Sequence, residues 1–532
     1  MSSDSSRPNL IVVLLDCVRA SALGGGGGAD LHLPRLEELR KESVVFERAV
    51  TVAPWTLPSH ATLFTGRYPW EHGVMGGGRL ALNPSLPTCA SLLRRRGYST
   101  LALTANGMIT PLLASGNSFD AYRSAAWWEK SFRWIRPERV DFGRRQVVRG
   151  LPGTLSLFRS AARSRSEPLP PSRFLRAGPS ATTLAQSVHE TRPEEITAGR
   201  WTESFNWAML DGMNRVARVL QVPDDPRALP VAPWIEHALE SWLAGLPRDR
   251  PVHCFINFLD AHERYLSDAE VVRGLLGWLR YVRIPQNPRL LLQGKWRPTE
   301  AQMELLRLLY ARTIQRLDSR VGAVVDLLRR AGRWDNTMLV VTSDHGQAFG
   351  EHGELFHERC PFETLLNVPL WVRWPQGAGG GVVIPDRVSL TDLTPTLLTA
   401  GGTEPPAGLP GIALGPRGPY RRDTPVLAMA DGYPSIEHYR ERMTPALSER
   451  LLRQFAVAYV GNFKALVGQH DGRVQVFDLE SDPGEAAPVD TPTAHDALAA
   501  VDAARTTAAR IEGARTGAVD VALHDQLASW GY

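Results

Sequence analysis

TLPSHATLFTGRYP, residues 56–69, is the stretch from which the fold of this chain is best inferred. Pro58 suits the first turn of a helix, residues 61–64 continue it, and Gly66 can end it. Such a helix leaves Thr56 beside backbone N–H groups, which attract an anion. The other interpretation is a loop followed by a core helix that Thr56 caps. Residues elsewhere in the chain must decide between a nucleophile and a cap.

Two apolar segments end in residues that can bind a metal ion. Residues 10–15 indicate a strand buried on both faces, which ends at Asp16. Residues 338–341 indicate a second such strand, which leads to Asp344 and His345. Open α/β sheets build their sites at the carboxyl ends of parallel strands. With the Thr56 oxygen, these three side chains provide four oxygen and nitrogen ligands for one divalent cation.

These segments resemble the sulfatase family of the alkaline phosphatase superfamily. Sulfatases carry Cys or Ser, then x, Pro, Ser and Arg, followed by TGRYP, whereas this chain has Thr56 in the first position and His60 in the fifth. Oxidation to formylglycine is therefore not expected. The segment also resembles the nucleotide pyrophosphatase and phosphodiesterase branch, which has Thr here, followed by Pro and His. A Thr hydroxyl can attack phosphorus when a metal ion holds it as an alkoxide.

The resemblance also bears on the identity of the metal ion. Sulfatases with an Asp-Asn pair hold calcium through oxygen ligands, whereas the Asp-His-Gly branches often hold zinc. His345 therefore favours Zn²⁺ or Mn²⁺, with Ca²⁺ as the alternative. Cys17 stands where sulfatases usually carry a second Asp. It is either a ligand for a soft metal or, in the favoured interpretation, a small buried residue.

Two further histidines, His262 and His357, are predicted to be catalytic. His262 ends VHCFINFLDAH, and His357 follows His345 at a spacing that resembles bacterial phosphoethanolamine transferases. The resemblance implies that both bind substrate oxygens and protonate the leaving oxygen, or hold a second metal ion that Asp260 could join. Taken alone, each would more often be a solvated or capping residue. His60 is expected to border the nucleophile, and to orient it or contact phosphate.

Some anion contacts of these families are missing. After GYST, sulfatases continue with Gly, Lys, Trp and His, whereas this chain reads LALTANG. The pyrophosphatase branch places an Asn shortly after His-Gly, where this chain has MGGG. That donor is absent or comes from elsewhere, for example from Asn106. Substrate specificity therefore cannot be transferred from either branch.

Length and composition favour an enzyme with one large core and a smaller one. The chain has 532 residues, of which 43% are hydrophobic and 22% charged. A net charge of +4 argues against a nucleic-acid surface. The N-terminal MSSDSSRPN lacks an apolar signal region, and no stretch approaches the length of a membrane span, so a cytoplasmic location is expected. The expected partner is a small-molecule, lipid or sugar ester, and the oligomeric state is not predicted.

Alternating helix and strand patterns predict an α/β fold. We expect a large mixed, mostly parallel central sheet flanked by helices, and a smaller C-terminal subdomain with an antiparallel sheet. Residues 1–120 and 251–410 are assigned to the catalytic domain, and residues 411–532 to the C-terminal α+β subdomain. Residues 121–250 are an insertion, partly helical and rich in Pro, Ser and Arg. The insertion could form a lid, or only a surface elaboration or oligomer contact.

These features predict a metal-dependent hydrolase in which Thr56 attacks a phosphate mono- or diester or a sulfate ester, with the phosphoester favoured. A phosphotransferase would use the same phosphothreonine intermediate, with an acceptor alcohol in place of water. The alternative from a different class is a catalytically inactive sulfatase-like protein that only binds its ligand.

Overall fold

A computed structural model describes most of the chain outside the predicted insertion. The described residues are 7–24, 31–76, 81–114, 118–124, 175–176, 231–286 without 264, 266–267, 269–270 and 273, then 296–357, 360–420, 422, 424–431, 453–489 and 494–515. Most of the 121–250 insertion, including most of the helical part expected there, lies outside these residues. The part that is described contributes β4 (Ala121–Ser124) and β5 (Leu175–Arg176) to the main sheet, and α10 (Val231–Ala244) to a layer of helices beside it.

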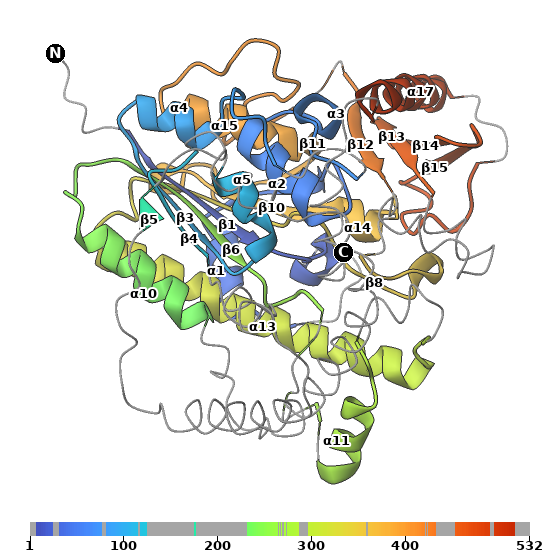
Figure 1. Cartoon of the computed structure of the whole chain (residues 1–532), viewed down its shortest axis with the longest axis horizontal. Coiled ribbons are helices and arrows are strands. Elements are labelled where there is room, and N and C mark those ends of the chain that lie inside the picture. Colours follow the sequence, from blue (N-terminus) through green and yellow to red (C-terminus); the bar gives the residue numbers. More distant parts are fainter. Residues whose placement is uncertain are drawn as a thin grey trace, which may run out of the picture.

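A nine-stranded mixed sheet lies at the centre of the described structure (Figure 1). In spatial order its strands are β11 (Val383–Ser389), β2 (Val44–Val50), β10 (Asn367–Arg373), β7 (Thr337–Thr342), β1 (Asn9–Leu15), β6 (Val252–Phe258), β3 (Ser99–Thr104), β4 (Ala121–Ser124) and β5 (Leu175–Arg176). β1 pairs in parallel with β6 and β7, and β3 in parallel with β6 and β4. Among the strands described, the antiparallel pairs in this sheet are those of β10 with β2 and β7, and that of β5 with β4. The predicted large, mostly parallel sheet is confirmed.

Helices cover both faces of the sheet (Figure 1). One layer contains α1 (Pro34–Lys41), α10 (Val231–Ala244) and α13 (Glu300–Arg330), and the other contains α2 (Thr56–Thr65), α4 (Cys89–Arg95) and α15 (Leu393–Ala400). Successive residues of β1 alternate between the two cores, because neighbouring side chains of a strand point to opposite faces. Residues 10, 12 and 14 pack in the core of α2, and residues 11, 13 and 15 in the core of α13.

A second, four-stranded antiparallel sheet lies in the C-terminal part of the chain, as the sequence predicts. Its strands are β12 (Val426–Ala430), β13 (Phe455–Val460), β14 (Phe463–Gly468) and β15 (Val474–Asp478), and α17 (His495–Arg515) packs on it (Figure 1). Lys464 of β14 is fully buried, and its Nζ lies 3.0 Å from Glu363 and 2.6 Å from Glu485. Glu363 begins α14 (Glu363–Leu366) beside the main sheet, so this ion network joins the two sheets.

The remaining α-helices and strands of the described residues are short. They are α3 (Pro69–His72), α5 (Thr110–Ala114), α11 (Gly274–Val282), β8 (Ala348–Phe349) and β9 (Leu355–Phe356). Among the residues that the structure describes, no helix combines the length and apolar character needed to cross a membrane.

Candidate active site

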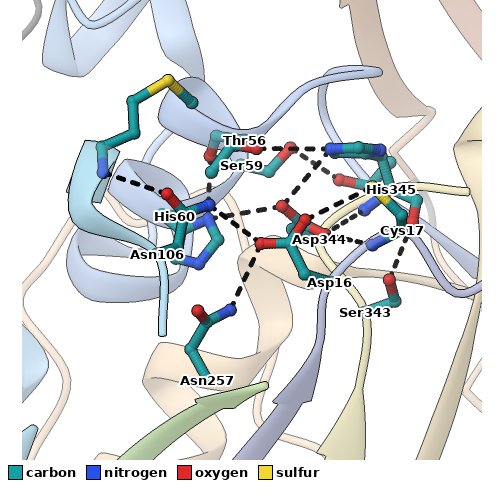
Figure 2. Close-up of polar contacts among 12 residues, drawn as sticks. Asp16, Cys17, Thr56, Ser59, His60, Asn106, Asn257, Ser343, Asp344 and His345 are labelled. Carbon is teal, nitrogen blue, oxygen red and sulfur yellow. Dashed lines mark hydrogen bonds and ion pairs between the residues drawn. The ribbon is translucent and has the colours of Figure 1, made fainter. Parts of the chain in front are cut away.

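The side chains expected to form the site meet at one edge of the main sheet (Figure 2). β1, β7, β6 and β3 are parallel neighbours, so their carboxyl ends lie together. Asp16 follows β1, and Asp344 and His345 follow β7. Thr56 begins α2, which lies against the same edge. The side chains of all four residues are fully buried.

Thr56 directs its hydroxyl at His345. The Thr56 Oγ1 lies 3.4 Å from Nε2 of His345, and Nδ1 of His345 lies 2.9 Å from the Gly346 carbonyl oxygen. Nδ1–H donates to that carbonyl, which leaves the Nε2 lone pair facing Thr56. Ser59 lies on the same helix but donates to the Ala53 carbonyl at 2.8 Å. Thr56 is therefore the hydroxyl of this helix that points into the cluster (Figure 2).

Two amides hold Asp16 in place. Nδ2 of Asn106 donates to Oδ2 of Asp16 at 3.1 Å, and Nδ2 of Asn257 approaches the same oxygen at 3.4 Å. Thr104 fixes the orientation of Asn257 by donating to its Oδ1 at 2.9 Å. Sequence reasoning named Asn106 only as a donor to the transferring group and missed Asn257. The signal was an Asn near the end of VHCFINF, a strand that is otherwise mostly apolar.

One carboxylate oxygen of Asp344 accepts no hydrogen bond from the described residues. Its Oδ1 accepts the backbone N–H of Cys17 at 3.3 Å and of His345 at 2.9 Å. Its Oδ2 is buried without a hydrogen-bond partner among the described residues, 3.4 Å from Nε2 of His345 and 3.5 Å from Nδ1 of His60. Burial and the negative charge of Asp16 raise the pKa of Asp344 well above its usual value. A divalent cation at Oδ2 fits these observations.

The imidazoles next to these carboxylates are neutral at physiological pH. Burial lowers the pKa of His345 to about 3, with His357 acting in the same direction, and burial also lowers the pKa of His60. Burial alone would raise the pKa of Asp16, but His262, His345 and His60 together bring it below its usual value. A neutral imidazole offers a nitrogen lone pair, which makes it a suitable donor for zinc or manganese.

His60 lies one turn into α2 and contacts the start of that helix. Its Nδ1 donates to the Thr56 carbonyl oxygen at 2.9 Å. The ring packs edge-on against Phe64 and Phe255, with centroid distances of 6.2 and 5.8 Å. Of the two roles expected for His60, these contacts fit orientation of the nucleophile.

His262 and His357 come together beside this cluster, with a carboxylate between them. Oε2 of Glu263 lies 3.1 Å from Nδ1 of His357 and 3.5 Å from Nδ1 of His262. The ring centroids of the two histidines are 4.9 Å apart. His357 stacks on His345, with a centroid distance of 5.0 Å. The sequence interpretation missed Glu263, although it directly follows His262 in the loop after β6.

Asp260, which the sequence suggested as a partner of His262, does not join this group. Burial raises the pKa of Asp260, while the positive charges of Arg320 and Arg316 on α13 act in the opposite direction. The donors that lie near one another form three groups within the described residues. They are Asp16, Cys17 and His345; Asp16, His60 and Asp344; and Cys17, His262, Glu263 and His357.

Comparisons with known proteins agree with this fold. A sequence model described as Sulfatase matches residues 8–132 and 283–403. Arylsulfatase K of Danio rerio is 34% identical over 419 residues, covering 77% of this chain and 68% of the relative. N-acetylglucosamine-6-O-sulfatase of Bacteroides thetaiotaomicron is 23% identical over 498 residues, covering 91% and 82%.

A solved structure shows the same fold. The phosphonate monoester hydrolase of Agrobacterium radiobacter superposes with a TM-score of 0.58 at 18% identity, covering 96% of each chain. At this identity the likeness shows the shared fold alone. On the extent of the match to the zebrafish relative and to the family model, the chain belongs to the sulfatase family of ester hydrolases.

Proposed function

We propose that this protein is a metal-dependent phosphoester hydrolase in which Thr56 is the nucleophile. The observation that supports this most is the position of the Thr56 hydroxyl, fully buried and 3.4 Å from Nε2 of His345. No Cys or Ser occupies this position, so aldehyde-based sulfate chemistry has no starting residue here. Solved structures with this fold include phosphonate monoester hydrolases, so the fold is compatible with chemistry at phosphorus.

Sulfatase-family enzymes bind a divalent metal ion, and the residues of this chain fit one. Asp16, Thr56, Asp344 and His345 would hold it, and the donor set favours Zn²⁺ or Mn²⁺ over Ca²⁺. When bound, the ion lowers the pKa of the Thr56 hydroxyl and neutralises charge on the phosphoryl group. Asn106 and Asn257 keep Asp16 oriented for that role.

The reaction then proceeds in two displacements at phosphorus. The Thr56 oxygen forms a bond to phosphorus, the bond to the leaving oxygen breaks, and a phosphothreonine results. In the second step water forms a bond to phosphorus and the bond to the Thr56 oxygen breaks, which returns the hydroxyl and releases phosphate from a monoester or a phosphate monoester from a diester. An acceptor alcohol in place of water would make the protein a transferase. His60 is a positioning residue for Thr56 through its bond to the Thr56 carbonyl. His262 and His357 bind the substrate or leaving oxygens, either directly or through a second metal ion.

Turnover of a panel of nitrophenyl phosphate mono- and diesters, phosphonates and sulfate esters tests this proposal. We expect the phosphorus esters to be cleaved faster than the sulfate ester. Thr56→Ala should lower kcat by at least about a thousandfold, the scale seen when a nucleophile is removed. Thr65→Ala is the matched control, because Thr65 lies at the other end of α2 and bonds only to its neighbouring backbone. Full activity in Thr56→Ala would show that the nucleophile is misassigned.

A further inference from the structure

Cys17, His262, Glu263 and His357 bring a thiol, two imidazoles and a carboxylate to one place. Their donor atoms all lie within 4.8 Å of one another. In a tetrahedral zinc site, bond lengths of roughly 2.0–2.3 Å place the donors about 3.3–3.8 Å apart. One pair of these residues, Glu263 Oε2 and His357 Nδ1, is already at 3.1 Å. The distance between any other two donors would have to shorten by at most about 1.5 Å, from 4.8 Å to about 3.3 Å, for all four to bind one ion.

The backbone at Cys17 is a second, independent observation. Cys17 has φ of 62°, a left-handed conformation that is unfavourable for a residue with a β-carbon. It is held there because Tyr310 donates to the Cys17 carbonyl at 3.0 Å and Asp344 accepts its N–H at 3.3 Å. A glycine or asparagine would adopt this conformation more readily. The cysteine therefore supplies a thiol at the cost of backbone strain.

The charges around the cluster also favour a cation here. Asp344 and Glu263 have buried carboxylates, and among the described residues the ion-pair partners that they contact are histidines. A divalent ion held beside Glu263 would place a positive charge next to these carboxylates.

We infer that Cys17, His262, Glu263 and His357 form a structural zinc-type site next to the catalytic one. A closed set of four protein ligands containing sulfur is typical of structural zinc and disfavours calcium or magnesium. Gln347 supports it from outside, since its Nε2 approaches Oε2 of Glu263 at 3.3 Å and Tyr265 at 2.7 Å. The inference replaces the substrate contacts given above to His262 and His357, because both rings become ligands of a closed site. Its donors exclude Thr56, so it and the proposed function can fail separately.

Cobalt substitution of the full chain tests the site. After chelator treatment and reconstitution with Co²⁺, we expect about two ions per chain and a thiolate-to-cobalt charge-transfer band in the near ultraviolet. Cys17→Ser should lose the band and one ion, and Glu263→Gln should weaken the same ion. Cys89→Ser is the matched control, because Cys89 is equally buried but lies on α4 outside the three donor groups. Asp344→Asn should lose the other ion and keep the band, and Thr56→Ala should keep the band while losing turnover.

The inference is overturned if the wild-type protein shows no charge-transfer band, or if Cys17→Ser keeps the band and both ions. It is also overturned if Asp344→Asn abolishes the band while Glu263→Gln leaves it intact, because Cys17 would then belong to the first site. X-ray absorption of the wild-type zinc protein needs no variant to fold. One sulfur neighbour in the zinc coordination shell supports the site, and a shell of nitrogen and oxygen alone contradicts it.

Discussion

At the scale of single residues, the site depends on a few side chains whose orientation is fixed by neighbours. Thr56 faces His345 because the other ring nitrogen of His345 is bound to the Gly346 carbonyl. Asp16 is held by two amides, and Asn257 in turn by Thr104. Such supporting contacts determine how well the metal ligands are placed before the ion binds.

Asn257→Leu should weaken metal binding at the first site. Leu keeps the approximate size of the side chain but removes the amide that approaches Asp16 at 3.4 Å. Loss of a contact that orients a ligand typically lowers metal affinity by about ten- to a hundredfold. Competition with a chromophoric chelator measures the change. Asn83→Leu, at a half-buried position that contacts Ser85, should bind metal as the wild type does, and equal affinity in both variants would mean that Asn257 does not orient Asp16.

His72 should make the protein less stable as the pH falls. It is buried at the end of α3, where its Nδ1 accepts the Val74 N–H at 3.0 Å and Nε2 lies 3.1 Å from Thr62 Oγ1. Burial lowers the pKa of His72 from 6.5 to about 3. In the unfolded chain His72 therefore binds a proton near pH 6.5, whereas in the folded chain it binds one only near pH 3. The free energy of unfolding is greatest above pH 6.5 and falls between these two values by about 5 kcal/mol.

The variant His72→Gln tests this pH dependence. Gln can accept and donate at similar positions but does not titrate, so thermal midpoints measured between pH 8 and pH 4 should fall less steeply than in the wild type. The exposed His470→Gln should follow the wild-type curve. If His72→Gln shows the wild-type slope, the buried imidazole does not account for acid sensitivity.

At the scale of elements, α14 connects the second sheet to the site. Glu363 at its start bonds Lys464, while the Leu365 carbonyl accepts the N–H of Gly346 at 2.9 Å. Gly346 permits this approach, since a β-carbon there would lie 2.0 Å from the Thr364 carbonyl oxygen. The C-terminal sheet thus helps to fix the loop that carries Asp344 and His345.

Lys464→Met should destabilise the protein by about 3–5 kcal/mol, the usual result of breaking a buried ion pair. It leaves the carboxylates of Glu363 and Glu485 facing each other without the ammonium between them. Chemical denaturation measures the loss. Adding Glu485→Gln to Lys464→Met should restore part of it, because one of the repelling charges is removed. Lys41→Met, at an exposed position of α1, serves as the control, and equal stability of the two single variants would contradict the role of the network.

The sequence predicted the elements better than their side-chain partners. Continuous apolar runs identified β1 and β7 and the residues that follow them, because a strand buried on both faces has a distinctive pattern. The pattern did not reveal Glu263 or Asn257, since a short polar residue after or within a strand has many ordinary roles. The sequence interpretation considered Asp260 as a partner of His262 and did not consider Glu263, because periodicity does not say which loop residue turns inward. The domain limits and the lid role of residues 121–250 stay predictions.

At the scale of the whole molecule, three buried carboxylates at one sheet edge make metal binding and stability interdependent. Chelator treatment should lower the thermal midpoint, and added Zn²⁺ or Mn²⁺ should restore it. An ion at about a hundred times its Kd stabilises the folded state by about 2.7 kcal/mol. Asp344→Asn should respond less to added metal, because it lacks the oxygen that has no hydrogen-bond partner among the described residues. An unchanged midpoint in chelator and in metal would contradict metal binding by the wild-type protein.

The central claim is that Thr56 becomes phosphorylated during turnover. Acid quenching of the metal-loaded protein during turnover of a nitrophenyl phosphate diester, followed by peptide mass spectrometry, tests it directly. The account predicts that the peptide containing Thr56 carries the phosphoryl-linked fragment of the substrate, and that the adduct is absent from Thr56→Ala, which also fails to turn over. Rapid turnover with an unmodified Thr56 peptide, together with full activity of Thr56→Ala, would contradict it.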